Sequence, residues 1–163
     1  MHYTALDNCQ DFIERYGIRA VKVLDVGSYD VNGTVKPLFI AENCEYTGLD
    51  IEEGPNVDKV MKLGEKLPFK DNSFDVIVST SCLEHDPAFW ETVREMMRVS
   101  SGYIYLNAPS AQNYHAYPID CWRFLADSMK ALSRLSDDWE LLESYVDKRL
   151  PWGDCVGIFK CLS

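Results

Sequence analysis

The sequence lacks the features by which membrane, secreted and nucleic-acid-binding proteins are recognised. No apolar run approaches the roughly 18 residues that a membrane span requires. The first residues, MHYTALDNCQDF, do not have the charged-then-apolar layout of a signal peptide. Lys and Arg are scattered, and the formal net charge of -10 repels a phosphate backbone. We therefore expect a cytoplasmic protein whose partner is a small molecule rather than a membrane or a long nucleic acid.

The sequence also lacks any pair of cysteines in the CxxC spacing. We expect reduced thiols that behave as small buried hydrophobes, and we expect no metal site. The chain has 163 residues, of which 47% are hydrophobic, so it can bury a core and form a single domain over residues 1–163. The cysteines are Cys9, Cys44, Cys82, Cys121, Cys155 and Cys161.

Strand-like and helix-like segments alternate through most of the chain, which predicts a doubly wound, mostly parallel α/β sheet. Asp86 and Pro87 are expected as N-cap and first turn of one helix, with Trp90 on its buried side. The last two strands are expected to pair as an antiparallel hairpin. Expected strands are 20–26, 45–50, 57–61, 74–79, 103–107, 140–146 and 154–161, and expected helices surround 6–16, 37–42, 89–97 and 125–135.

Glycine is scarce in the loop after the first strand, LDVGSYDVNG. Asp25 ends the strand and Gly27 permits a tight turn against a ligand, but Tyr29 and Val31 occupy the positions of the later glycines. A pyrophosphate needs bare amides at those positions, so the loop is a poor dinucleotide site. Taken alone, the loop is better explained as an ordinary strand-to-helix turn. Asp50 ends the second strand, where an acid can accept two hydrogen bonds from a ribose diol, although a solvated turn remains an alternative.

Four segments in this order, VLDVGS, YTGLD, EKLPFKDNSFDVIVSTSCLEH and YPIDCWRF, resemble the class I S-adenosylmethionine-dependent methyltransferases of the small, single-domain, type 11 kind. The resemblance covers nearly the whole chain from Val21, and its most specific segment is LPFKDNSFDVIVSTSCLEH. It implies a Rossmann-like, seven-stranded sheet with an antiparallel C-terminal strand. It also implies transfer of a methyl group from S-adenosyl-L-methionine to an unidentified small-molecule acceptor, with S-adenosyl-L-homocysteine as product.

The resemblance assigns a cofactor site. Asp25, Gly27 and Ser28 would line the methionine end of the cofactor, and Asp50 would hold the ribose. Many relatives carry an acid near the adenine; this chain has Leu63 there, with Glu65 two residues further on. Adenine would then lie against backbone amides around Leu63 and Gly64 and against Ile51. Residues 79–82, beginning with Ser79, would lie beside the cofactor.

Candidate acceptor residues follow the fourth and fifth strands. The resemblance places His85 near the acceptor mouth, although a His before a helix is often only a neighbour of its cap, and Glu84 can be no more than a favourable charge there. The segment 108–124 is long, aromatic and polar, as functional loops often are. In it, His115 is a candidate base, while Trp122 and Phe124 are expected to complete the core. Its candidate substrate-binding residues are Tyr114, Tyr117, Asp120 and Arg123.

Two other functional classes stay open. A nicotinamide-dependent oxidoreductase would need the missing glycines. A methyltransferase-like module that binds without turnover fits the short chain, but Asp25, Gly27 and Asp50 favour an enzyme. A general base is needed only if the acceptor is protonated at pH 7, and His85 or His115 would then serve.

Overall fold

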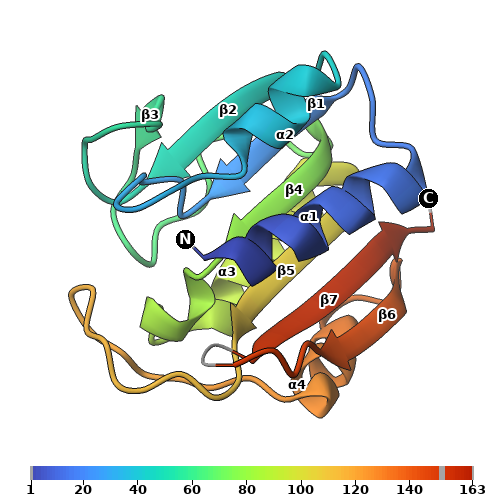
Figure 1. Cartoon of the computed structure of the whole chain (residues 1–163). Helices are drawn as coiled ribbons and strands as arrows, with labels where there is room; N and C mark the ends of the chain where they lie inside the picture. The colour runs from blue at the N-terminus through green and yellow to red at the C-terminus, as the bar shows by residue number, and fades with distance from the viewer. Residues whose placement is uncertain (1, 151–152, 163) are drawn as a thin grey trace.

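The computed structural model describes residues 2–150 and 153–162. These residues form one seven-stranded sheet in the order β3-β2-β1-β4-β5-β7-β6 (Figure 1). The predicted seven-stranded, doubly wound architecture is confirmed. The strands are β1 Lys22–Val26, β2 Glu45–Asp50, β3 Lys59–Val60, β4 Phe74–Thr80, β5 Ser100–Pro109, β6 Trp139–Val146 and β7 Asp154–Cys161.

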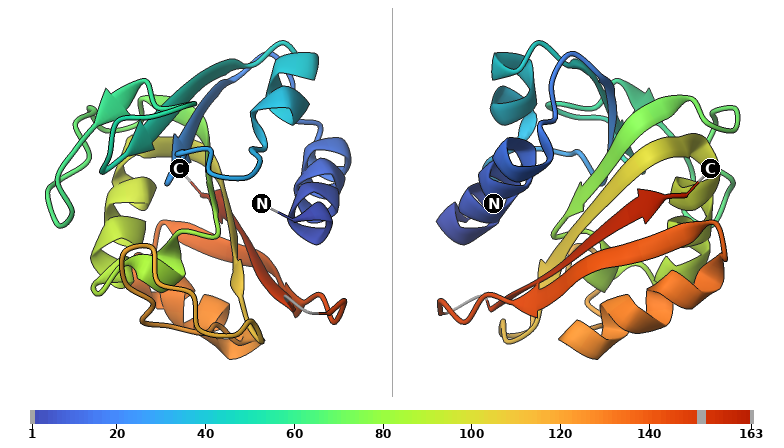
Figure 2. Two further views of the ribbon diagram at one scale, coloured as in Figure 1. Left: turned by 60° about the vertical axis from the view of Figure 1, so that its left-hand side comes forward. Right: turned by 90° about the vertical axis from the view of Figure 1, so that its right-hand side faces the viewer.

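Helices cover both faces of the sheet. In Figure 2, α1 and α2 lie on one face and α3 and α4 lie on the other. Two apolar cores agree with this layering, because Phe12 and Phe39 belong to one buried cluster and Met96 and Met129 belong to the other. The helices are α1 Tyr3–Tyr16, α2 Lys36–Ala41, α3 Phe89–Val99 and α4 Ala126–Leu132, with short 3-10 turns η1 Leu83–His85 and η2 Ser133–Leu135. None of the helices in the described residues is long and apolar enough to cross a membrane.

The first helix follows the predicted pattern. Its buried residues include Ala5, Cys9, Phe12 and Ile13, which recur at the spacing that places side chains on one helical face. Gly17 ends the helix in the left-handed conformation, with φ 64°, and its N–H points back at the last turn. A side chain at that φ is strained, so glycine is the residue that ends the helix here.

The centre of the sheet creates the ligand-binding edge. β1 pairs in parallel with β2 on one side and with β4 on the other, so the chain order reverses beside β1. Ligands in such sheets bind beyond the carboxyl ends of the strands at this reversal. β4 is buried along almost its whole length, as a central parallel strand must be. The ends of β1, β2 and β4 therefore open on one side of the molecule.

The last two strands are antiparallel, as predicted. β7 lies between β5 and β6 and runs antiparallel to both. Cys155 is buried on β7, and Cys9 and Cys44 are buried elsewhere, which agrees with their expected role as small hydrophobes. Cys121, in contrast, is exposed.

Three local predictions are corrected. Ala20 has φ 53°, a left-handed conformation that a strand residue does not adopt, so β1 begins at Lys22 instead. The N-cap of α3 is Ala88 rather than Asp86. Asp86 precedes the helix and accepts hydrogen bonds from the backbone N–H of Ala88, at 2.8 Å, and from the Thr92 hydroxyl. Trp90 is 37% exposed and not on the buried side.

Candidate active site

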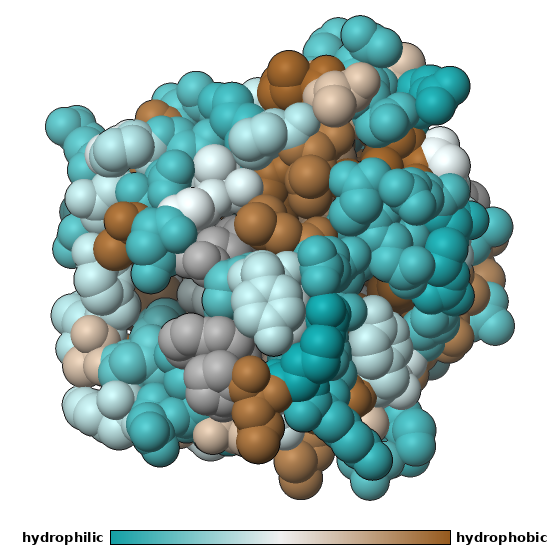
Figure 3. All heavy atoms as spheres, viewed as in Figure 1, coloured by the Kyte–Doolittle hydropathy of each residue, from teal (hydrophilic) through white to brown (hydrophobic). Residues whose placement is uncertain are grey.

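A cavity of about 560 Å³ lies beyond the carboxyl ends of β1, β2 and β4. Figure 3 shows the surface hollowed between the side that carries β3 and the segment 110–120, which we call the lid. The first strand end and its loop line one part of the cavity, and His85 with the lid lines another. The cavity therefore spans both groups of residues that the sequence singles out.

The loop after β1 is fixed by backbone hydrogen bonds. The amides of Gly27 and Ser28 both donate to the Leu49 carbonyl, at 2.9 and 3.1 Å, so the loop is tied to the end of β2. Gly27 has φ 86°, and a Cβ added to it would overlap the Cβ and Sγ of Cys82. Glycine is therefore required here by conformation and by the approach of the residues that follow β4.

Asp25 is a buried acid with one unused oxygen. Its side chain is 2% exposed, and one carboxylate oxygen accepts a hydrogen bond from the Tyr46 hydroxyl. The other oxygen, Oδ1, is buried and has no hydrogen-bond partner among the described residues. Burial raises the pKa of Asp25 to about 7, against the opposing effect of the Tyr46 hydrogen bond. The position suits a cationic group of a ligand.

Asp50 faces the cavity from the end of β2. Its two oxygens accept hydrogen bonds from the backbone N–H of Tyr29, at 2.9 Å, and of Ile51, at 2.7 Å. Each carboxylate oxygen has a further lone pair, so Asp50 can still accept from a ligand hydroxyl. Beside it, the cavity wall is apolar and is formed by Ile51, Met61, Leu63 and Leu67.

Arg123 holds the lid. Its guanidinium donates to both oxygens of Asp120, at 2.6 and 2.7 Å, and to the carbonyls of Gln112 and Asn113, at 2.8 and 3.0 Å. Asp120 also accepts from the backbone N–H of His115 at 2.7 Å. The Arg123 hydrogen bonds keep the pKa of Asp120 well below its usual range. The ion pair thus fixes the backbone that carries His115.

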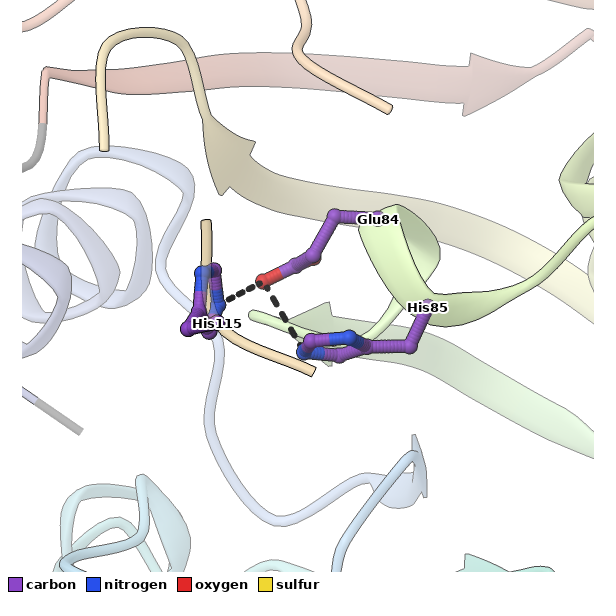
Figure 4. Close-up of side chains that lie close together, drawn as sticks. All are labelled: Glu84, His85 and His115. Atoms are coloured by element: carbon purple, nitrogen blue, oxygen red, sulfur yellow. Dashed lines mark ion pairs between the residues drawn. The ribbon is translucent and has the colours of Figure 1, made fainter. Parts of the chain in front are cut away.

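Glu84, His85 and His115 come together under the lid (Figure 4). Glu84 Oε1 lies 3.6 Å from His85 Nε2 and 3.7 Å from His115 Nε2. Glu84 is fully buried, and burial raises its pKa to about 8. His85 Nδ1 lies 2.6 Å from the Ile119 carbonyl, and burial lowers the pKa of its imidazole. Glu84, which precedes α3, is therefore a buried carboxyl group that also contacts two imidazoles.

Comparison with known proteins assigns the family. A family model described as a methyltransferase domain matches residues 24–106, just over half of the chain. The chain belongs to the class I S-adenosylmethionine-dependent methyltransferases. A comparison with curated protein sequences gives no match.

Solved structures of methyltransferases share the fold. One is 1,6-didemethyltoxoflavin-N1-methyltransferase from Burkholderia thailandensis, solved with 1,6-didemethyltoxoflavin and S-adenosylhomocysteine; it is 16% identical, with a TM-score of 0.76, covering 98% of this chain and 79% of that one. Another is magnesium protoporphyrin IX methyltransferase from Synechocystis, solved with S-adenosylmethionine, at 13% identity, TM-score 0.70, and coverage of 97% and 78%. A third, a SAM-dependent methyltransferase from Aquifex aeolicus, is 16% identical with a TM-score of 0.60, and both chains are covered completely.

Most of the predicted site residues line the cavity of this methyltransferase. Ser79 does not, because it is fully buried and its hydroxyl donates to the Val26 carbonyl at 2.8 Å. Tyr114 is 77% exposed, Asp120 and Arg123 bind each other, and Glu65 is exposed beyond the wall. The residues that do line it are Asp25, Gly27, Ser28, Asp50, Ile51, Leu63, Gly64, His85, His115 and Tyr117.

The structure adds residues to this methyltransferase site that the sequence did not single out. Tyr46 contacts Asp25, and Asn56 donates to the Ser28 carbonyl at 3.0 Å beneath the loop. Trp122, expected in the core, is 38% exposed and packs on Phe89, whereas Phe124 is buried as predicted. The LEH segment carried the only sequence signal that pointed to Glu84.

Proposed function

We propose that this methyltransferase acts on a small-molecule acceptor held between its cofactor and the lid. The observation that supports this most is the continuity of one cavity from Asp25 and Asp50 to His85 and His115. A methyl donor at one end and a nucleophile at the other would then lie within one cavity. S-adenosylmethionine supplies the methyl group together with its own leaving group, so the protein's part is alignment and exclusion of water.

The residues present fit the proposed cofactor. Asp25 Oδ1 is an unpartnered buried acceptor, which suits the ammonium group at the methionine end. Asp50 retains lone pairs for a ribose diol, and Ile51 and Leu63 form an apolar wall that suits adenine. Tyr29 and Val31 in place of glycines do not conflict with this ligand, because it carries no pyrophosphate.

The lid would bind and orient the acceptor. His85 and His115 face the cavity, and either would accept a proton from a hydroxyl or amino nucleophile. Tyr117 would exclude water, and Arg123 with Asp120 would keep the lid in place. Two of the similar methyltransferases act on small molecules, according to their names, and one of these methylates a ring nitrogen. The net charge of -10 disfavours long polyanions as acceptors, which agrees with a small-molecule acceptor. We propose a cytoplasmic location for the chain.

Thermal melting with S-adenosylmethionine, S-adenosylhomocysteine and NAD tests the cofactor assignment. A ligand at about 100 times its dissociation constant stabilises the fold by about 2.7 kcal/mol. The two adenosyl ligands should raise the melting temperature, and NAD should not. Stabilisation by NAD alone would contradict the proposal and favour an oxidoreductase.

A screen of hydroxy, amino and carboxylate small molecules then separates an enzyme from a silent binding module. We expect S-adenosylhomocysteine to form with at least one acceptor class. With that acceptor, His115→Ala should lower turnover by about 100-fold if His115 is the base, and should leave cofactor affinity unchanged. Binding of S-adenosylmethionine without any turnover would support the module instead.

A further inference from the structure

Glu84, His85 and His115 offer three metal-ligand atoms that lie within 4.8 Å of one another. We propose that these residues bind one divalent first-row transition-metal ion at the acceptor end of the cavity. The sequence alone predicts no metal there, because His115 lies 30 residues away from His85 and reaches it only through the lid.

Hydrogen bonds set the protonation state of both imidazoles. His85 Nδ1 lies 2.6 Å from the Ile119 carbonyl, and His115 Nδ1 lies 3.1 Å from the Asn113 carbonyl. A carbonyl only accepts, so the Nδ1 of His85 carries the proton and donates it. The Nδ1 of His115 also lies 3.5 Å from the Arg123 guanidinium, and the nearer carbonyl favours the same tautomer. Each neutral ring then has a lone pair on Nε2, and both Nε2 atoms face Glu84 (Figure 4). Metal-binding histidines are commonly oriented in this way by a carbonyl behind the ring.

The carboxyl group between them receives no hydrogen bond from the described residues. Glu84 is fully buried, and neither of its side-chain oxygens has a hydrogen-bond partner among the described residues. A buried carboxylate without a hydrogen bond or a cation is costly. Three lone-pair donors that converge on one point, one of them an unsatisfied acid, are the arrangement that a cation stabilises.

The backbone holds the three ligands near the required spacing. The Glu84 carbonyl accepts from the amides of Cys121 and Trp122, at 2.7 and 3.2 Å, so η1 is tied directly to the residues that follow the lid. Metal–nitrogen and metal–oxygen bonds of about 2.0 to 2.2 Å place neighbouring ligand atoms about 3 to 3.5 Å apart. The distances of 3.6 and 3.7 Å from Glu84 exceed this by only a few tenths of an ångström, and all three atoms lie within 4.8 Å of one another, so the two imidazoles would move together when the ion binds.

The ligand types select the ion. Two imidazoles and one carboxylate suit Zn²⁺, Fe²⁺, Co²⁺ or Mn²⁺, whereas Ca²⁺ and Mg²⁺ prefer sites built from oxygen alone. Three protein ligands leave coordination positions open, and His85 and His115 line the cavity, so these positions face it. Given the proposed function, the ion would bind an acceptor oxygen or nitrogen, lower its pKa and orient it toward the cofactor.

Titration with Co²⁺ tests the site directly. The whole chain is first dialysed against a chelator, and Co²⁺ binding is followed by its visible d–d absorption. We expect one Co²⁺ per chain, displaced by Zn²⁺. Glu84→Gln, which keeps the size of the side chain, and His115→Ala should each weaken binding by about 100-fold or more, since even partners behind the ligands change affinity 10- to 100-fold.

His2 is the matched control, because it is the third histidine of the chain and also lines the cavity, but it contacts Asp154 and does not belong to the three-ligand group. His2→Gln should leave Co²⁺ binding unchanged. Absence of the absorption band in the parent protein, or its persistence in Glu84→Gln, would overturn the metal site. Binding of S-adenosylhomocysteine by each metal-free variant, measured by calorimetry, shows that it is folded. Metal-free protein that binds this ligand while Co²⁺ does not bind would refute the metal site alone and leave the proposed function standing.

Discussion

The two ends of the cavity are built in different ways. At the end near Asp25 and Asp50, the loop is held by backbone amides that donate to Leu49 and to Asp50, both on the neighbouring strand. At the acceptor end, Arg123 ties the two ends of the lid together through an ion pair and two carbonyls, and His85 and the Glu84 carbonyl tie the lid and the residues after it to η1. The cofactor end is therefore built from the ends of sheet strands, whereas the acceptor end is built from a loop that is fastened beside the sheet.

This difference separates a shared function from a variable one. A methyl donor is the same molecule for every enzyme of the family, so a binding loop fixed by the sheet serves all acceptors. An acceptor site on a long loop can change without altering the sheet. Substitutions at the two ends should therefore affect different measurements: cofactor affinity at the first end and turnover at the second.

The largest expected effect is from Gly27→Val, which should abolish S-adenosylhomocysteine binding. The reason is that the new side chain overlaps Cys82 and must adopt φ 86°, which displaces the loop from the end of β4. Calorimetry measures the loss. Gly17→Val is the control, because Gly17 has φ 64° but an added Cβ would have no atom of the described residues within 4 Å, and Gly17 ends α1 away from the cavity. Unaltered affinity in Gly27→Val would show that the loop is only a turn.

Arg123→Gln should have the next largest effect, on turnover alone. Without the guanidinium, the lid loses its hydrogen bonds to Asp120 and to two carbonyls, and a misplacement of about 1 Å at the reacting groups costs about 100-fold in rate. Cofactor affinity should stay near that of the parent. Arg94→Gln is a matched control, because Arg94 also pairs with an acid three residues away, Glu91, but on an exposed helix surface. Equal losses of turnover in both variants would contradict a role for the lid.

The sequence predicted the strand ends but not the contacts between them. The expected strand 45–50 coincides with β2, and Asp25 and Asp50 were correctly placed at the ends of neighbouring parallel strands. The Tyr46 hydroxyl reaches Asp25 because Tyr46 pairs with Val23, two residues before Asp25 on the same face of the sheet. That pairing depends on the register of β1 against β2. A slip of one residue would move Tyr46 to the other face of the sheet, and the residues around Tyr46 alone do not specify the register.

The acceptor end was less predictable for the same physical reason. The sequence identified His85, His115, Asp120 and Arg123, and it left open whether Asp120 and Arg123 hold the acceptor or tie the lid down; the structure pairs these two with each other. The burial of Glu84 was not predicted, because it depends on residues 113–122 folding back over η1. Contacts between a loop and a distant turn have no periodicity from which they can be inferred.

Asp50→Ala is expected to have a moderate effect, confined to the cofactor end. Loss of a charged acceptor for a ribose diol should weaken S-adenosylhomocysteine binding by about 1 to 3 kcal/mol, or about 5- to 150-fold. Because Asp50 also accepts from the Tyr29 amide, Asp50→Asn serves as a second variant that retains one acceptor oxygen. It should lose less affinity than the alanine variant. Equal affinity of Asp50→Ala and the parent in calorimetry would remove Asp50 from the ribose site.

The smallest expected effect is the pH dependence of cofactor binding through Asp25. Burial raises the pKa of this carboxyl to about 7, and the charged and polar groups that act on it are Tyr46, Asp50 and Lys36. The unfolded value is near 4, so the ligand-free fold binds an extra proton between these values. The contribution of the protonated Asp25 carboxyl to the free energy of unfolding is complete below about pH 4 and is lost as the pH rises through about 7.

Without ligand, burial favours the protonated form of Asp25. A bound ammonium group favours the carboxylate instead, because the opposite charge lowers the pKa of Asp25. Binding below about pH 7 must then release a proton, so affinity for S-adenosylhomocysteine should rise about tenfold between about pH 6 and about pH 7.5 and level off above. Calorimetry in buffers of different ionisation enthalpy counts the released proton. Asp25→Asn keeps an acceptor for Tyr46 but cannot titrate, so its affinity should be weaker and independent of pH in this window. If the asparagine variant retains the parent's pH profile, Asp25 is not the titrating group, and the unused oxygen at the end of β1 is not the site of the ammonium.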